Sequence, residues 1–360
     1  MVTSKHYIPL LRWRMGEYQA LEKLGEAQKK ATVPLLEILP PDYDFELRKP
    51  KKDIDEHLKS FGDKLKKKWD ARSALLDAGR LEPMVRVADG RHPITFIFDE
   101  ARVLGTTGTP VTTIERDAAY QQAVRMINAV DLRGAALRCT LAEALDPDFD
   151  DQVEDLLARL EIGADSLDIL LDLETPAFDP HDDLVAVIVA ALTSAKVFGH
   201  SRSVTLLATS FPETMTALKL SIQQVPRREW SLYKAVVAAL PDTVRRPAFG
   251  DYGVAALKFA QGDMRYMRGS PNIRYAIDDA WLVAKAKRTP GSSNHAYPGL
   301  CKLIIGSGSY HGSGYSAGSA YIEGCRTGAT TRGNPTVWKW VATNHHITKV
   351  LDDLARLPGS

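Results

Sequence analysis

Cysteine is scarce in this chain, and several expected signatures are missing. The three cysteines, Cys139, Cys301 and Cys325, form an odd and widely spaced set among 360 residues. This argues against a disulfide framework and for a reducing compartment. No Cys-x-x-Cys or His-x-x-x-His pair occurs, so a zinc site has little support. No G-x-G-x-x-G follows the first predicted strand, and the Gly-rich run lacks the Lys-Ser/Thr of a phosphate loop.

Long apolar runs and an excess of charge are also missing. The longest apolar stretches, such as residues 184–192, are far shorter than a membrane-spanning helix requires. No apolar run follows the basic residues near the N-terminus, so we expect no signal peptide. The formal net charge of +1 gives no global attraction to nucleic acid or membrane. We therefore expect a soluble cytoplasmic protein without a membrane partner.

The chain does contain a series of short apolar strands that each end in a charged residue. The clearest is the run 167–174, which carries Asp172 and Glu174 at its end. Predicted strands alternate with helical patterns and short connections, which leaves a closed (β/α)8 barrel or an open doubly wound sheet. We predict the TIM-like barrel, because about eight strands can be counted. The predicted strands are residues 7–11, 33–39, 94–98, 135–140, 167–174, 203–208, 247–253 and a hairpin within 272–287.

Two helices are predicted, one with a lysine-rich face and one with a capping box at its start. Residues 53–69 have apolar positions at helical spacing and many lysines on the other face. A solvated face is the favoured interpretation, and a patch for nucleic acid or another acidic partner is the alternative. Thr112 and Glu115 have capping-box spacing, which predicts a helix from there to about residue 130. Residues 71–91 are less periodic and are interpreted as part of a loop.

The last third of the chain differs in composition. We place a (β/α)8-like barrel over residues 1–290, and a loop and a helix that pack on it over residues 291–360. The loop, 306–333, is rich in Gly, Ser and Tyr, which is typical of a functional loop or a lid. The helix, 338–357, begins after it and contains the sequence Asn-His-His at 344–346.

Five short motifs are spread over nearly the whole chain: residues 7–17, 249–252, 272–275, 315–316 and 338–348. Together, and in this order, they resemble the phage beta-protein family, found in phages and many bacterial genomes. Where the family often has Trp and Gly-Asp after the serine, this chain has Ala317, Gly318 and Ser319. The resemblance implies a one-domain protein linked to phage–host conflict, and it implies no catalytic residue.

Charged residues at the strand ends form the candidate site, because the C-terminal ends of barrel strands meet at one mouth. Acids there could hold Mg²⁺ or Mn²⁺, and arginines could bind a phosphate. The alternative is that these charges pair with each other and hold the strand ends in place. Asp168 lies deeper on the same strand face as Asp172, so inside a barrel it requires a partner such as an arginine. The set is Arg12, Arg14, Glu37, Asp99, Glu100, Arg138, Asp172, Glu174, Asp251 and Tyr252.

The C-terminal third adds a serine and histidines to the candidates. Residues 314–318 match G-x-S-x-G around Ser316, but no clean strand precedes them, so a nucleophile elbow is disfavoured. Adjacent helical residues point about 100 degrees apart, so His345 and His346 do not readily serve one ligand. His311 in the loop is a further candidate. Tyr315 and Ser316 are taken as ligand-binding candidates.

Two hypotheses of function follow. The first is a barrel whose mouth binds or hydrolyses a phosphate-bearing small molecule or nucleotide, with Asp172, Glu174, Asp99 and His345 as catalytic candidates. The second is a non-catalytic interaction protein with a protein partner, an antiphage defence component. Whether the chain is an enzyme stays open at this point.

Overall fold

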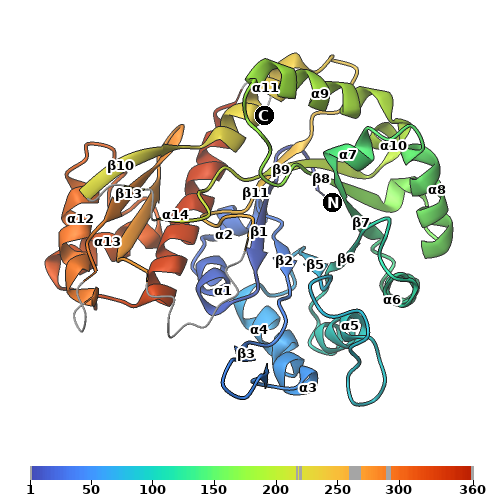
Figure 1. Cartoon of the computed structure of the whole chain (residues 1–360), viewed down its shortest axis with the longest axis horizontal. Coiled ribbons are helices and arrows are strands. Elements are labelled where there is room, and N and C mark those ends of the chain that lie inside the picture. Colours follow the sequence, from blue (N-terminus) through green and yellow to red (C-terminus); the bar gives the residue numbers. More distant parts are fainter. Residues whose placement is uncertain (1, 216–217, 219–220, 259–268, 289–292, 358–360) are drawn as a thin grey trace. The chain divides into compact units, whose positions relative to one another are not determined.

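The chain folds into two compact units. The computed structural model describes residues 2–215, 218, 221–258, 269–288 and 293–357 (Figure 1). The first unit comprises the described residues of Met1–Trp13, Lys30–Ala208 and Leu232–Asp251. The second comprises those of Arg14–Lys29, Thr209–Ser231 and Tyr252–Ser360. Among the described residues, no helix has the length and apolar character needed to cross a membrane.

The first unit is a closed barrel of eight strands, which confirms the predicted fold class. Neighbouring strands pair in parallel in the order β1, β2, β5, β6, β7, β8, β9 and β11, and β11 pairs with β1. All their C-terminal ends therefore meet at one end of the barrel. The strands are β1 (Tyr7–Arg12), β2 (Leu35–Glu37), β5 (Leu75–Asp77), β6 (Thr109–Thr112), β7 (Ala135–Thr140), β8 (Leu167–Asp172), β9 (Ser203–Ala208) and β11 (Ala248–Asp251).

Helices connect the strands and cover the outside of the barrel, as Figure 1 shows for α5, α6 and α8. Each buries one apolar stripe; in α8 this stripe includes Val153, Leu156 and Leu160. A two-stranded hairpin, β3 (Tyr43–Asp44) and β4 (Lys49–Pro50), follows β2. The connecting helices are α3 (Ile54–Leu58), α4 (Phe61–Lys68), α5 (Pro93–Val103), α6 (Ala118–Asp131), α7 (Leu141–Ala144), α8 (Phe149–Leu160), α9 (His181–Ser194), α10 (Lys196–His200) and α11 (Arg228–Ala239), with a short 3₁₀ turn at Ala164–Ser166.

The predicted strand at 94–98 is wrong, because these residues form the start of helix α5. His92 caps this helix by accepting a hydrogen bond from the backbone N–H of Ile94, and Pro93 occupies its first turn. The buried positions Ile94, Ile97, Phe98 and Ala101 follow helical spacing. A short apolar run that contains β-branched and aromatic residues is compatible with a strand or a helix. Here the His92 cap and the apolar Ala101, which continues the helical spacing, indicate the helix.

Three other boundaries also differ from the prediction. The irregular stretch 71–91 contains strand β5, and the predicted helix start at Thr112 is the end of strand β6. Helix α6 begins later, where Asp117 accepts a hydrogen bond from Tyr120 N–H. The hairpin within 272–287 exists, but its strands belong to a separate antiparallel sheet. The barrel therefore contains two strands that the sequence analysis did not predict, β5 and β6. The two predicted strands that do not belong to it are residues 94–98 and the hairpin within 272–287.

The strand alternation places one set of side chains inside the barrel. Leu10, Leu35, Leu75 and Leu170 are 0–2% exposed and lie on the inner face. At the N-terminal end of β8, Asp168 also faces inward, as the sequence predicted. It meets the expected arginine: Arg202 Nε and Nη2 lie 3.0 and 2.6 Å from its two carboxylate oxygens. Ser203 Oγ donates a third hydrogen bond at 2.7 Å, so this buried charge is fully paired.

The second unit consists of a three-stranded antiparallel sheet and the helices packed with it. Its longest element is α14 (Pro335–Ala355), which Asn334 caps and whose buried residues lie on nearly every side. Its core contains Tyr297 stacked on Trp338, with ring centroids 4.5 Å apart. The other elements are α1 (Met15–Glu22), α2 (Glu26–Lys30), β10 (Ser221–Pro226), β12 (Asn272–Ala276), β13 (Ala280–Lys285), a 3₁₀ turn at Ser293–Ala296, α12 (Tyr297–Ile305) and α13 (Ala317–Thr327).

Candidate functional site

Arg138 of β7 lies at the centre of an ion-pair cluster at the C-terminal end of the barrel. Its Nε and Nη2 lie 2.8 and 2.7 Å from Asp172 Oδ2. Its Nη1 lies 3.4 Å from Glu37 Oε1 and 3.2 Å from Asp77 Oδ2. Arg12 Nε lies 3.7 Å from Glu37 Oε2. The three carboxylate side chains are only 1–3% exposed, so each requires a paired cation, and Arg138 serves all three.

Three members of this cluster were missed from the sequence: Asp77, Arg80 and Arg116. Arg80 Nε lies 2.7 Å from Glu37 Oε1, and Arg116 Nη2 lies 3.7 Å from Asp77 Oδ1. Asp77 ends a strand of three residues, too short for a periodic signal. A Leu-Leu-acid pattern could have found it, because 75–77 repeats the endings 35–37 and 170–172. The mouth cluster is thus defined as Arg12, Glu37, Asp77, Arg80, Arg116, Arg138 and Asp172.

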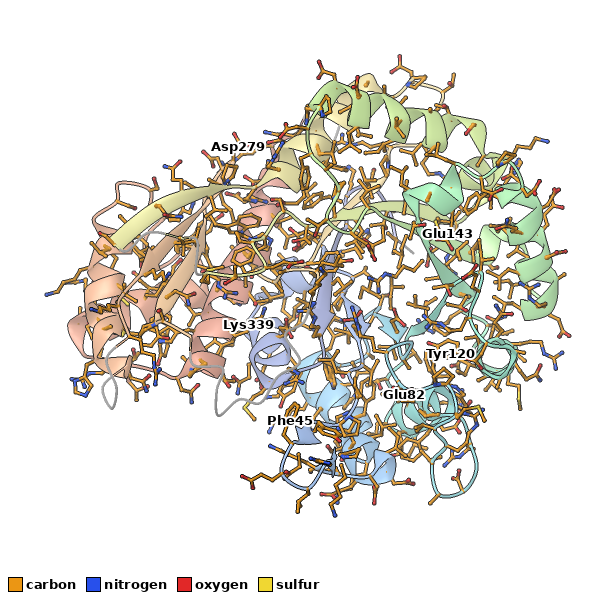
Figure 2. All side chains as sticks on the ribbon, viewed as in Figure 1. Phe45, Glu82, Tyr120, Glu143, Asp279 and Lys339 are labelled. Atoms are coloured by element: carbon orange, nitrogen blue, oxygen red, sulfur yellow. The ribbon has the colours of Figure 1, made fainter. Side chains whose placement is uncertain are left out.

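The turn after β5 positions the two arginines that surround it. Gly79 N–H donates to Asp77 Oδ1 at 2.8 Å, and Arg116 Nη1 donates to Gly79 O at 3.0 Å. A Cβ at Gly79 would overlap the Arg116 guanidinium, so this close approach depends on glycine. The Arg116 guanidinium also lies 4.9 Å above the ring of Tyr120, which is labelled on α6 in Figure 2.

The mouth cluster contains four guanidinium groups and three carboxylates. Its exposure is graded: the Arg80 side chain is 39% exposed, Arg116 19%, Arg138 15% and Arg12 8%. The carboxylates lie below, almost fully buried. Mutual pairing accounts for the acids, as the alternative interpretation predicted, and within the mouth cluster as defined the guanidinium groups outnumber the carboxylates by one.

Two predicted catalytic acids do not join the mouth cluster. Strand β8 ends at Asp172, and Glu174 is exposed with a φ of +55°, so the predicted strand alternation does not extend to it. Its backbone N–H instead donates to Asp172 Oδ1 at 2.9 Å. Asp99 lies on helix α5 and pairs at the surface with Arg91 and Arg102, at 2.6 and 2.7 Å. The strand that would have carried Asp99 to the mouth is a helix.

Asp251 ends strand β11 but lies on its outer face. In the strand register, Gly250 pairs with Leu207 and Leu207 pairs with Asp172, which lies on the inner face. Gly250 therefore also lies on the inner face, and the next residue, Asp251, lies on the outer face. Its Oδ1 accepts a hydrogen bond of 2.5 Å from the hydroxyl of Tyr7, which also lies on the outer face. This buried carboxyl group therefore links the adjacent strands β1 and β11 on the outside of the barrel.

The remaining predicted site residues belong to the second unit. Arg14 is the N-cap residue of α1, and its carbonyl accepts hydrogen bonds from Glu17 and Tyr18 N–H at 3.0 and 3.1 Å. Tyr252 is 1% exposed, and its carbonyl accepts a hydrogen bond from Ala255 N–H at 3.2 Å. His345, Tyr315 and Ser316 lie around the Gly-rich loop and α14.

His345 is fully buried and bonded at both ring nitrogens. Its Nε2 lies 2.8 Å from the carbonyl oxygen of Ala276, so this nitrogen carries the proton and Nδ1 accepts. The hydroxyls of Ser319 and Ser316 lie 3.2 and 3.4 Å from Nδ1. The ring stacks on Tyr275 with centroids 3.7 Å apart. Burial lowers the pKa of His345 to about 3, far from the value near 7 that suits a general base, so the geometry favours a structural role.

Three residues near His345 also form hydrogen bonds within the fold: Ser316, Asn344 and His346. Ser316 is the N-cap of α13 and accepts a hydrogen bond from Ser319 N–H at 2.9 Å. Residues 306–315 form no strand, so the strand that leads into the serine of a nucleophile elbow is missing. Asn344 Oδ1 accepts from Gly318 N–H at 3.0 Å. His346 Nδ1 accepts from Trp281 Nε1 at 3.3 Å, on a different side of α14 from His345, as the helix geometry predicted.

We expect His345 to make folding stability depend on pH. In the unfolded chain its pKa is about 6.5, whereas burial lowers it to about 3 in the folded protein. The unfolded state therefore binds more protons between these values, so stability is full above pH 6.5 and falls as pH drops towards 3. Between pH 6.5 and 5 this group should cost about 2 kcal/mol, at about 1.4 kcal/mol per pH unit. Urea unfolding over this range, together with imidazole ¹⁵N shifts, measures it.

A matched control is available for this prediction. His345→Gln should remove this group's share of the loss and so make the pH profile less steep, whereas the same substitution at the exposed His200 should not. A folded-state His345 that titrates near pH 6.5 would contradict the assignment of a buried neutral imidazole.

The described residues contain no group of three or more His, Cys, Asp or Glu side chains placed to hold a metal ion. In the mouth cluster each carboxylate pairs with arginine, and backbone N–H groups of Gly79 and Glu174 bond the second oxygens of Asp77 and Asp172, so few oxygens remain for Mg²⁺ or Mn²⁺. The arrangement is therefore suited to hold arginines in fixed positions.

The closed parallel barrel with a polar C-terminal mouth defines a (β/α)8 barrel protein, a class in which ligands bind at that end. The chain belongs to the Beta protein family, whose profile matches residues 7–352, and this confirms the resemblance seen in its motifs.

Similar solved structures were also found. One is triosephosphate isomerase from Bartonella henselae, with a TM-score of 0.34 and 10% identity over 70% of this chain and 94% of that one. Another is a protein with a proposed lyase or mutase activity from Burkholderia cenocepacia, with a TM-score of 0.32 and 17% identity over 71% and 78% of the two chains. No curated protein matches significantly.

Proposed function

We propose that the mouth of the barrel binds a phosphate-bearing small molecule. The observation that carries this proposal is the excess of guanidinium groups over carboxylates in the mouth cluster, with the most exposed arginines on the solvent side. Guanidinium groups match phosphate oxygens in geometry and charge. The location supports the same proposal, because ligand sites of such barrels lie at the C-terminal ends of the strands.

Arg80 and Arg116 are the residues that would meet the ligand first. Their side chains are more exposed than that of Arg138, and each is held by a carboxylate below it. The buried acids thus fix the arginines before the ligand arrives, which lowers the entropy lost on binding. Arg138 holds the acids in place and acts as a positioning residue. The proposal concerns binding, and the interaction-protein hypothesis stays a prediction.

Removing the charge of Arg80 should weaken phosphate binding at least about tenfold, because a charge-assisted hydrogen bond contributes about 1.5–3 kcal/mol. We would titrate the full chain with inorganic phosphate, pyrophosphate and a nucleotide panel by calorimetry, and repeat this with Arg80→Gln. Gly79→Ala is a second variant, because its Cβ would displace the Arg116 guanidinium and leave the net charge unchanged.

The matched control is Arg133→Gln. Arg133 is exposed and precedes β7, at the N-terminal end of the strand, so this variant makes the same charge change away from the mouth. Equal affinity of the parent and of Arg80→Gln would overturn the proposal. An equal loss in Arg133→Gln would mean that the anions respond only to overall charge.

A further inference from the structure

The loop between β5 and α5, residues 78–92, carries a guanidinium group that no acid compensates. Arg86 Nη1 donates hydrogen bonds to the carbonyl oxygens of Pro83 and Val85, at 2.8 and 2.7 Å. Among the described residues, no carboxylate lies within ion-pair distance of Arg86, and its Nε and Nη2 are not buried. A half-buried guanidinium that is held by carbonyl groups and lacks an ion pair is suited to bind an anion.

The backbone of the loop fixes the position of Arg86. Val87 N–H donates to Arg91 O at 3.1 Å, and Gly90 N–H donates to Val87 O at 2.8 Å. Gly90 has a φ of +88°, a conformation that favours glycine. The chain therefore turns back over residues 87–91, which places Arg86 beside His92 at the base of the turn. His92 is also the N-cap of α5, so the turn is anchored to a helix.

Tyr120 of α6, labelled in Figure 2, connects this turn with the mouth cluster. The His92 ring meets the ring of Tyr120 edge-on, with centroids 5.2 Å apart, and the Arg116 guanidinium lies 4.9 Å above the same ring. The buried hydroxyl of Tyr120 accepts a hydrogen bond from Ala78 N–H at 3.2 Å and donates one to Val111 O at 3.0 Å. Both ends of the loop are therefore held against one buried side chain.

Positive charge predominates around this ring. Arg86 and Arg116 are the nearby cations, and Asp117 is the nearby acid. Asp117 is the N-cap of α6 and lies beyond ion-pair distance of both arginines. Burial, and after it the charge of Arg86, lower the pKa of His92, so its ring is neutral at pH 7. Its Nδ1 accepts a hydrogen bond from the backbone of α5, so Nε2 carries the proton and is a further donor.

We propose that the ligand of the barrel mouth carries a diphosphate group, with one phosphoryl group at Arg80 and Arg116 and the other at Arg86. This inference rests on the proposed function and adds the class of ligand to it. Arg116 links the two positions, because it contacts the turn that precedes Arg80 and the ring that His92 also contacts. A single phosphate would leave Arg86 without an anionic partner, whereas a diphosphate supplies a second set of acceptor oxygens.

The test is calorimetric titration of the full chain with inorganic phosphate and with pyrophosphate. We expect the parent to bind pyrophosphate at least about tenfold more tightly than phosphate, because the second phosphoryl group gains a charge-assisted contact. Arg86→Gln should weaken pyrophosphate binding about tenfold. It should change phosphate binding by less than about twofold, because the first phosphoryl group contacts other side chains. Retained phosphate binding also shows that the variant is folded.

The control Arg133→Gln makes the same charge change on an exposed residue at the N-terminal end of β7, and it should leave both affinities unchanged. Equal affinity of the parent for phosphate and pyrophosphate would overturn the inference, and so would parent-like pyrophosphate binding in Arg86→Gln. An equal loss in Arg133→Gln would also overturn it. In each of these cases phosphate binding at the mouth would persist, whereas the failure of the proposed function would abolish binding of both anions.

Discussion

Arg138→Met is expected to lower the free energy of unfolding by about 3–5 kcal/mol, because it leaves buried carboxylates without their shared cation. Glu37, Asp77 and Asp172 are each within 3.4 Å of Arg138, and their side chains are 1–3% exposed. Methionine keeps much of the volume, so the loss reports on charge pairing and little on packing. Urea unfolding followed by circular dichroism measures it.

A second arginine provides the comparison. Arg125 pairs with Glu161 at the surface, where the two side chains are 34% and 65% exposed. Arg125→Met should therefore cost about 1 kcal/mol or less. If Arg138→Met cost no more than Arg125→Met, the mouth cluster would not be the electrostatic centre of the barrel.

Gly318→Ala is expected to destabilise the second unit by about 2–3 kcal/mol, through overpacking between two helices. A Cβ there would lie well inside contact distance of the carbonyl oxygen of Val341 on α14, and 3.2 Å from the Cβ of His345. Backbone cannot rotate away as a side chain can, so α13 and α14 would have to separate. Thermal unfolding monitored by tryptophan fluorescence detects this, since Trp338 and Trp340 lie on α14.

The control lies in the same G-x-S-x-G match. A Cβ added at Gly314 would have no heavy atom within 4 Å, and this residue has no positive φ. Gly314→Ala should therefore change stability by only a few tenths of a kcal/mol. Equal effects of the two substitutions would contradict the conclusion that Gly318 is required by helix packing.

The barrel could be predicted from the sequence because its longer strands carry their own signal. The strands β7, β8 and β9 are six residues long and mostly apolar and buried, which is typical of parallel strands. The strands β5 and β6 are only three and four residues long, so their pairing depends on neighbours that are distant in sequence. The predicted number of eight strands was still correct, because the two strands that were missed, β5 and β6, equal in number the two that were wrongly assigned to the barrel.

The candidate site was predictable where a strand ended as expected. Arg12, Glu37, Arg138 and Asp172 meet at the mouth because each lies on the inner face at or near the end of a strand whose position was predicted correctly. Arg80 and Arg116 lie in turns, and only the three-dimensional packing of Gly79 brings them to the cluster. Asp251 shows the limit of the approach, since a shift of one residue turns a strand-end acid outward.

The central claim, that the arginine-rich mouth of the barrel binds a phosphate-like anion, is tested most directly by crystallography with tungstate, a heavy analogue of phosphate. We predict an anomalous peak within hydrogen-bonding distance of the Arg80 and Arg116 guanidinium groups, which disappears in Arg80→Gln. An empty mouth in fully soaked crystals, with both arginines still paired to Glu37 and Asp77, would contradict the claim.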